Sequence, residues 1–199
     1  MTDTTDETDS RLIAGFWQVV AAHGWDGVTL RRLAAASDLP AAAIRARAPQ
    51  GPGDLLRLHE RLADEAVAAG TVPGQGGTPR DRVFDVVMRR IDAMQPHRAG
   101  ILRLVDDLRL RPGLALCLLA QVPPSMARLL DAAEIESGGI YGAVRAQGLA
   151  GIWLATLRAW TRDDTADLGA TMAALDRALD RAEQVARSLR LDPGDMAAS

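Results

Sequence analysis

Lysine is absent from this 199-residue chain, and all 23 basic residues are arginine. Cysteine occurs once, as Cys117 within an apolar run. An internal disulfide is therefore excluded, and we expect a small buried side chain in a reducing compartment. Aromatic residues make up only 4% of the chain, whereas Ala and Leu are abundant, which favours helices over strands. These shortages predict an all-α protein.

Signals for export, membrane insertion and catalysis are also missing. The first ten residues, MTDTTDETDS, are acidic and polar, unlike a signal peptide, and no uninterrupted run reaches the roughly 18 to 20 apolar residues of a membrane span. The three histidines lie far apart without metal-ligand spacing, and no nucleophile motif is present. We therefore expect a cytoplasmic protein that is not an enzyme, with no integral membrane segment, metal or cofactor.

The segment Val28 to Arg47, VTLRRLAAASDLPAAAIRAR, predicts two short helices joined by a tight turn. Thr29 is a suitable N-cap for the first helix because its hydroxyl can accept a free backbone N–H. Residues 37–40 contain Ser, Asp and Pro, which end one helix and start another. Residues 41–47 form the second helix, with Ile44 facing inward. Such a helix-turn-helix can place its second helix in a DNA major groove.

Positive charge is concentrated around this motif, although the whole chain has a net charge of −3. Between residues 10 and 50, five arginines stand against two acids, a local charge of +3. The residues are Arg11, Arg31, Arg32, Arg45 and Arg47, against Asp26 and Asp38. A basic patch is the minimum requirement for phosphate contact, although a solvated helical face has the same composition. The residues expected to contact duplex DNA are Thr29, Arg31, Arg32, Ala41, Ala42, Arg45 and Arg47.

Residues Arg11 to Leu62 resemble the N-terminal region of TetR-type regulators in the order and lengths of their helices. The matching parts are a first helix (RLIAGFWQVVAAHGW), the VTLRRLAAASDLP helix and turn, a recognition-helix position and a fourth helix (GDLLRLHERLADEAV). The resemblance implies a DNA-binding head, a helical body that binds a regulatory ligand, and a homodimer formed through the last two helices. The expected fold is a TetR-like arrangement of about nine helices.

Residues 10 to 190 also resemble the ubiquinone-biosynthesis accessory proteins, which share the TetR fold. Three short motifs carry this resemblance: Ala22-His23-Gly24-Trp25, Pro49-x-Gly51-Pro52-x-x-Leu55, and Trp160 through Asp164 to Leu175-Asp176-Arg177. The alternative function that it implies is a lipid- or isoprenoid-binding accessory protein that does not bind DNA.

The rest of the chain divides at turn-forming residues. We expect a disordered tail over 1–9, the helix-turn-helix domain over 10–52, a ligand-binding and dimerisation body over 53–190, and a tail over 191–199. Thr78-Pro79-Arg80-Asp81 combines a hydroxyl cap, a proline and an acid, and therefore predicts a helix start. The nearly uniform apolar run from Leu114 to Val122 predicts a helix that is buried on most sides.

Large apolar side chains in the body predict a cavity for an apolar molecule or a lipid, although each of them also suits a plain hydrophobic core. We expect the ligand to contact Phe84, Met88, Leu118, Met126, Tyr141, Trp153 and Trp160. Tyr141 and Trp153 are the residues expected to orient it, because each has a polar group.

Two stripes near the C-terminus predict close helix packing. From Leu168 to Leu189, apolar residues repeat at alternating spacings of four and three, as in a coiled coil. The preceding helix has a stripe of small residues that permit close approach. This seam can pack within one subunit or across a two-fold axis; we favour the second, with an interface of Val144, Gly148, Gly151, Ala155, Leu168, Met172, Leu175 and Leu179.

Overall fold

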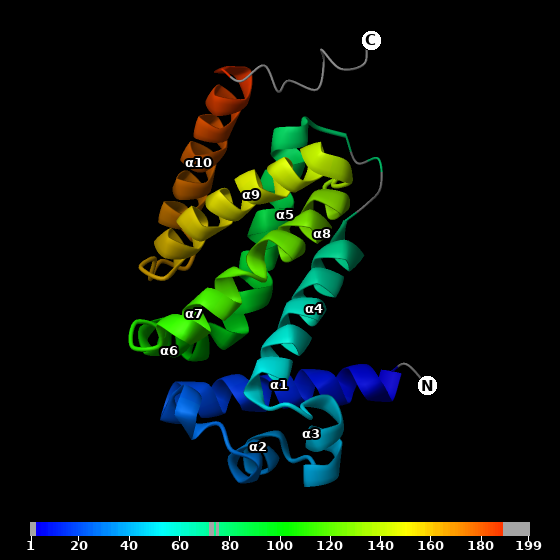
Figure 1. The fold of residues 1–199 in the computed structure, drawn as a ribbon, viewed down its shortest axis with the longest axis vertical. Helices are drawn as coiled ribbons and strands as arrows, with labels where there is room; N and C mark the ends of the chain where they lie inside the picture. The colour runs from blue at the N-terminus through cyan, green and yellow to red at the C-terminus, as the bar shows by residue number, and fades with distance from the viewer. Residues whose placement is uncertain (1–2, 72–73, 75, 189–199) are drawn as a thin grey trace. The chain divides into compact units, whose positions relative to one another are not determined.

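The computed structural model describes residues 3–71, 74 and 76–188, and this part of the chain contains helices and no strand (Figure 1). The α-helices are α1 (Asp3–His23), α2 (Leu30–Ser37), α3 (Ala41–Arg47), α4 (Pro52–Gly70), α5 (Pro79–Met94), α6 (Arg98–Leu108), α7 (Pro112–Leu119), α8 (Val122–Ala132), α9 (Gly139–Trp160) and α10 (Gly169–Ser188). Two short 3₁₀ helices, η1 (Trp25–Gly27) and η2 (Gln95–His97), connect neighbouring elements. The all-α prediction is confirmed.

The chain forms two compact units whose boundary differs from the expected one. The first unit contains residues 1–70 and 92–121, and the second contains residues 71–91 and 122–199. This grouping differs from the expected division at 52/53, because α4, α6 and α7 belong to the same compact unit as the helix-turn-helix. The physical reason is that α1 packs against both α4 and α6 as well as α2. The expected tail over 191–199 lies outside the described residues.

Helix α1 begins at Asp3, earlier than predicted, so the expectation of a disordered segment over 1–9 is wrong for residues 3–9, while residues 1–2 lie outside the described residues. Asp9 is buried and lies one helical turn before the buried Ile13. Its carboxylate contacts Arg47 of α3 and Arg61 of α4, so that it links three helices of the first unit. These ion pairs stabilise the first turns of α1. The polar and acidic composition of this segment had instead predicted disorder.

Helices α1 and α2 cross at a glycine. A Cβ atom at Gly15 would lie 2.9 Å from the backbone N of Ser37, so a larger side chain cannot fit without moving α2. The Ser37 hydroxyl donates to the Leu33 carbonyl oxygen at 2.7 Å, which satisfies it inside this contact. The α2–α3 pair is thereby held against α1 (Figure 1).

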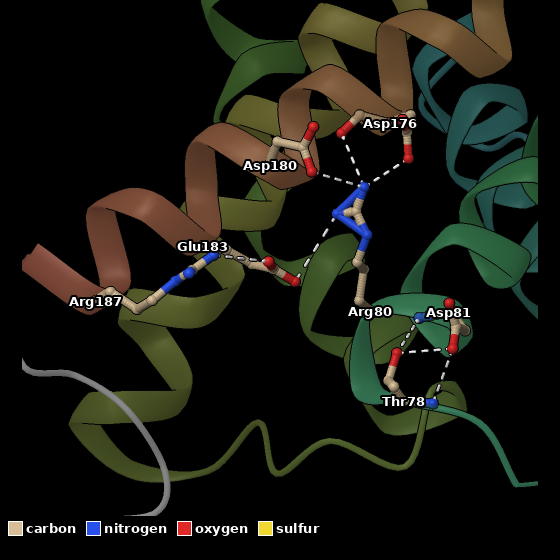
Figure 2. A network of polar contacts seen from close by, with 7 residues as sticks. All are labelled: Thr78, Arg80, Asp81, Asp176, Asp180, Glu183 and Arg187. Carbon is tan, nitrogen blue, oxygen red and sulfur yellow. Dashed lines mark hydrogen bonds and ion pairs between the residues drawn. The ribbon is translucent and has the colours of Figure 1, made fainter.

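The second unit is built on α5, α8, α9 and α10. Thr78 and Asp81 form the predicted capping box: the Thr78 N–H donates to Asp81 Oδ2 at 3.0 Å, and the Asp81 N–H donates to Thr78 Oγ1 at 3.2 Å. Arg80, which lies between these two residues in the first turn of α5, reaches α10 and contacts three carboxylates (Figure 2). Its nitrogen atoms lie 2.5 Å from Asp176, 2.9 Å from Asp180 and 3.9 Å from Glu183.

Helix α7 is exposed, contrary to the prediction that its apolar run is buried. Leu116 is 69% exposed, the preceding Leu110 is 87% exposed, and Cys117 is also exposed. Apolar residues occur all around α7, so that any orientation leaves some of them in solvent. By length and composition alone, the helical stretch Pro112–Ala132, with a mean hydropathy of 1.4, could cross a membrane.

Candidate nucleic-acid interface

The helix-turn-helix lies where the sequence predicts it, and hydrogen bonds from an arginine of α1 stabilise its turn. Asp38 ends α2 in the left-handed region, with φ of 53°. The Arg11 guanidinium donates to the carbonyl oxygens of Ser37 and Asp38 at 3.1 and 3.0 Å, and to the Asp38 carboxylate at 3.3 Å. It satisfies carbonyl groups that the end of a helix leaves without partners. Arg11 therefore supports the turn and is not available to phosphates.

The start of α2 offers Thr29 and Arg31 to solvent. Thr29 is the N-cap, as predicted, and its Oγ1 accepts from the Arg32 N–H at 3.4 Å. The Arg32 guanidinium donates to the Gly27 carbonyl oxygen at 3.0 Å and is half-buried. Arg31 is exposed and forms no ion pair or side-chain hydrogen bond with the described residues. Of the two arginines, Arg31 is therefore the one free to contact a phosphate.

Helix α3 is anchored by Ile44, which is 1% exposed. Pro40 serves as the N-cap and not as the first helical residue, because its ψ of 144° is extended. Ala42 and Arg45 are exposed and Ala41 is half-buried. Arg45, like Arg31, has no ion pair or hydrogen bond of its guanidinium within the described part of the chain.

Arg47 is turned inward, which corrects its assignment as a DNA contact. Its Nε contacts Asp9 Oδ1, its Nη1 donates to the Ala43 carbonyl oxygen at 3.4 Å, and its side chain is only 23% exposed. The other carboxylate oxygen of Asp9 lies 3.3 Å from Arg61 Nη2. Sequence reasoning missed Asp9 and Arg61. Asp9 could have been found, because it lies four residues before Ile13 and thus continues the inward face of α1.

A second carboxylate holds the chain just before α2. Asp107 of α6 accepts a hydrogen bond from the Trp25 N–H at 2.7 Å. This bond, with the Arg103 guanidinium at 3.1 Å, holds the pKa of the Asp107 carboxyl below its ordinary value. Trp25 in η1 is thereby fixed to α6 within the first unit, and it leads directly into α2.

The residues expected to bind an apolar ligand do not form one group. Met126 and Trp160 are completely buried, Trp153 is nearly so, and Phe84 and Met88 are half-buried in the second unit. Trp153 packs under the Arg90 guanidinium, whose carbon lies 5.3 Å from the ring centroid. Leu118 belongs to the first unit. Tyr141 is 49% exposed on the outer side of α9, which corrects its expected place inside the body.

The second unit has a hollow of about 290 Å³, and none of the predicted ligand residues lines it. Its walls include Arg82, Arg89, Asp85 and Glu134. Arg82 donates to the carbonyl oxygens of Gly77 and Ala133, and Arg89 pairs with Asp85 at 2.7 Å. The hollow is therefore not formed by the residues that the sequence predicts for an apolar ligand, and charged side chains stand in its walls. The described residues also contain no group of three or more side chains suited to a metal ion.

The predicted interface residues separate into an outer and an inner set. Val144, Gly148, Gly151 and Ala155 all lie on the exposed side of α9, and a Cβ at either glycine would meet nothing within 4 Å. By contrast, Leu168, Leu175 and Leu179 are buried within the chain, where α10 packs on α9. The α10 seam is thus filled inside the subunit at these three positions, a correction to their assignment. Met172 is partly exposed, and Leu189 lies outside the described residues.

Comparison with known proteins gives a fold. No protein-family model and no curated protein matches the sequence. Among solved structures, the chain is similar to a TetR transcriptional regulator from Rhodococcus sp. RHA1, with a TM-score of 0.61 and 14% sequence identity. The similarity covers 90% of this chain and 97% of that one. With the helix-turn-helix described above, this likeness shows that the chain has the fold of TetR-type transcriptional regulators.

Proposed function

We propose that this protein is a ligand-responsive transcriptional regulator that binds duplex DNA as a homodimer and catalyses no reaction. It would work in the cytoplasm, where a regulator meets DNA. The observation that carries the proposal is the helix-turn-helix in a TetR fold, with Arg31 at the start of α2 and Arg45 on α3 both exposed and unpaired within the described residues. Arg31 and Thr29 contact phosphates, and Arg45 reaches the base edges of the major groove.

Salt dependence of DNA binding tests this proposal directly. Each phosphate contact contributes about 0.9 to the slope of log affinity against log salt concentration. Arg31→Ala should therefore reduce the slope of a dimer by about two units, since one contact is lost in each head. Arg45→Ala should lower affinity for a selected sequence about tenfold or more, because a base contact is lost. Both are measured by gel retardation of duplex fragments across a salt series.

Arg162→Ala is the matched control, since Arg162 is exposed between α9 and α10 in the other unit. It removes the same charge and should leave both quantities unchanged. Retention that is independent of salt, or equal losses in all three variants, would contradict the assignment. The fold would then remain without a DNA-binding function.

The homodimer is proposed through the outer face of α9. This face combines exposed apolar residues such as Ile140, Val144 and Leu154 with open space over Gly148 and Gly151. Large and small residues side by side permit close packing of a symmetric pair of helices. Gly148→Ala should stabilise an isolated chain by up to about 1 kcal/mol through helix propensity. If α9 meets a second copy closely, the same change should weaken the dimer.

Sedimentation velocity at several concentrations distinguishes the two outcomes. Gly113→Ala in α7 is the control, because Gly113 also has nothing within 4 Å of a Cβ. A dimer unaffected by Gly148→Ala and by Gly148→Leu would place the interface elsewhere.

A second function, a lipid-binding accessory protein of the same fold that does not bind DNA, is favoured by α7. The outer side of α7 consists of uncharged residues, and Leu116 and Leu119 are 69% and 48% exposed. This function predicts co-sedimentation with phospholipid vesicles and no retardation of DNA. Leu116→Ser with Leu119→Ser should abolish vesicle binding, whereas Val185→Ser on α10 serves as the control.

A further inference from the structure

The outward surface of α3 consists of two alanine methyl groups and one arginine side chain. Ile44 faces inward, whereas Ala42, Arg45 and Ala46 face solvent. Ala42 and Ala46 are four residues apart, and residues at this spacing lie next to each other on one side of a helix. Arg45, three residues from Ala42, extends from the same side. One guanidinium and two methyl groups thus form the part of α3 that can face DNA.

The remaining arginine of α3 does not change this composition. Arg47 contacts Asp9 and the Ala43 carbonyl oxygen, so it would have to leave a buried carboxylate to reach a base. Removing one partner of such a buried pair is strongly unfavourable. The surface therefore offers hydrogen bonds to bases through Arg45 alone.

Only one base presents an apolar group in the major groove, namely thymine with its C5-methyl. Methyl groups of alanine contact thymine methyl groups favourably, whereas the polar edges of G·C pairs would lose hydrogen bonds to water without replacement. Alanine is also small enough to let the helix axis approach the bases closely. A seven-residue helix is roughly 10 Å long, which matches about three base pairs.

We propose that this head recognises thymine C5-methyl groups through Ala42 and Ala46, with Arg45 bound to a neighbouring guanine. This inference rests on the proposed function and specifies what the same site recognises. Each half-site then has two thymine methyls and one guanine within about three base pairs.

The experiment begins with selection of bound duplexes from a random pool by the full-length protein. The enriched duplexes are then synthesised twice, with thymine and with uracil, which differ only in the C5-methyl group. Removal of one contacted methyl should lower affinity roughly fourfold, and removal of all contacted methyls in two half-sites on the order of a hundredfold. Uracil placed only in the flanks is the control DNA and should have no effect.

Ala42→Gly and Ala46→Gly assign the effect to the two side chains. Glycine also weakens α3, so the measured quantity is the ratio of affinities for thymine and uracil DNA, which partial unfolding leaves unchanged. Because each substitution removes one methyl group from each head of the dimer, each variant should reduce this ratio by about the square of the factor that one methyl contributes. Ala14→Gly, on the exposed side of α1, carries the same helix penalty and should keep the wild-type ratio.

The outcomes separate the inference from the function on which it depends. Selective retention of thymine DNA that is lost in Ala42→Gly supports the inference. Retention of both DNAs with equal affinity, or a ratio unchanged in both glycine variants, overturns the inference and leaves the regulator function standing. Failure to retain any duplex at low salt overturns the regulator function and the inference together.

Discussion

Each compact unit contains a buried aspartate, and the two have opposite kinds of partner. Asp9, 6% exposed in the first unit, contacts the guanidinium groups of Arg47 and Arg61. Asp163, 4% exposed in the second unit, accepts hydrogen bonds from neutral groups among the described residues. These are the hydroxyl and N–H of Thr165 at 2.6 and 3.2 Å, and the hydroxyl and N–H of Thr171 at 2.7 and 2.8 Å.

Asp163 only supports the fold, whereas Asp9 also reduces the positive charge on the outer side of α3, because it holds Arg47 inward. Asp163 lies before α10 and accepts from an N–H of its first turn, where the helix dipole favours a negative charge. Asp9 performs a similar linking role, but it withdraws Arg47 from the outer side of α3. Changing Asp163 should therefore affect stability alone, whereas changing Asp9 should affect stability and DNA binding in opposite directions.

The largest effect is expected for Asp163→Ala. Its loss leaves the Thr171 N–H and hydroxyl without an acceptor in a buried place, and it releases the loop that ends at Leu168, which has a strained φ of 53°. The melting temperature, followed by circular dichroism, should fall by on the order of 5 °C or more. Asp167→Ala in the same loop is the control, because Asp167 forms a single exposed hydrogen bond of 3.3 Å. Equal losses would contradict the special role of Asp163.

Acid should remove the same contribution. Hydrogen bonds from the Thr165 hydroxyl and from Thr171 hold the pKa of the Asp163 carboxyl well below its ordinary value of 3.8. The stabilisation is therefore fully present above that ordinary value and is lost as the pH falls below it. Urea unfolding from pH 7 to pH 3 should show a stability difference between wild type and Asp163→Asn that shrinks below about pH 4. A difference that stays constant over this range would show that the charge is not the relevant property.

Sequence reasoning succeeded where a local rule determined the outcome. Ile44 was expected to face inward and is buried, and Thr29 and the Thr78–Asp81 box marked helix starts correctly. At both helix starts the partners lie three residues apart, so that their proximity follows from the chain itself.

Prediction failed where a residue's partner is distant in sequence. Arg47 pairs with Asp9, 38 residues away, so charge counting could not show that one of five arginines is turned inward. Likewise, the apolar run of α7 predicted burial, but composition does not state whether another element covers it. Tyr141 is exposed because the buried side of α9 passes through its neighbour Gly142 and not through Tyr141 itself. These outcomes depend on tertiary packing, which periodicity does not encode.

The second largest effect is expected for Asp9→Asn. An amide keeps the shape of the carboxylate but loses its charge, and we expect a decrease of about 2 kcal/mol in the free energy of unfolding, a moderate value because both arginines are partly exposed. Arg47 is then free to reach phosphates, so DNA affinity should rise and the salt slope of a dimer should steepen by about two units. Urea unfolding and gel retardation across a salt series measure the two quantities.

The double variant Asp9→Asn with Arg47→Ala is the control for this gain. It keeps the stability loss and removes the released charge, so its DNA affinity should return to the wild-type value or below. A gain that persists without Arg47 would mean that the charge of Asp9 itself repels DNA, and that Asp9 does not act by holding Arg47.

The smallest effect is expected for Arg61→Ala. Arg61 is 57% exposed and lies 3.3 Å from Asp9, and exposed ion pairs of this kind contribute about 0 to 1 kcal/mol. Asp9 keeps its contact with Arg47, so DNA affinity should stay unchanged in gel retardation. If affinity rises instead, Asp9 needs both arginines to stay in place, and α4 then influences the charge of α3 through this carboxylate. In that case Asp9 would connect α4 physically to α3, whereas Asp163 has no such role in the second unit.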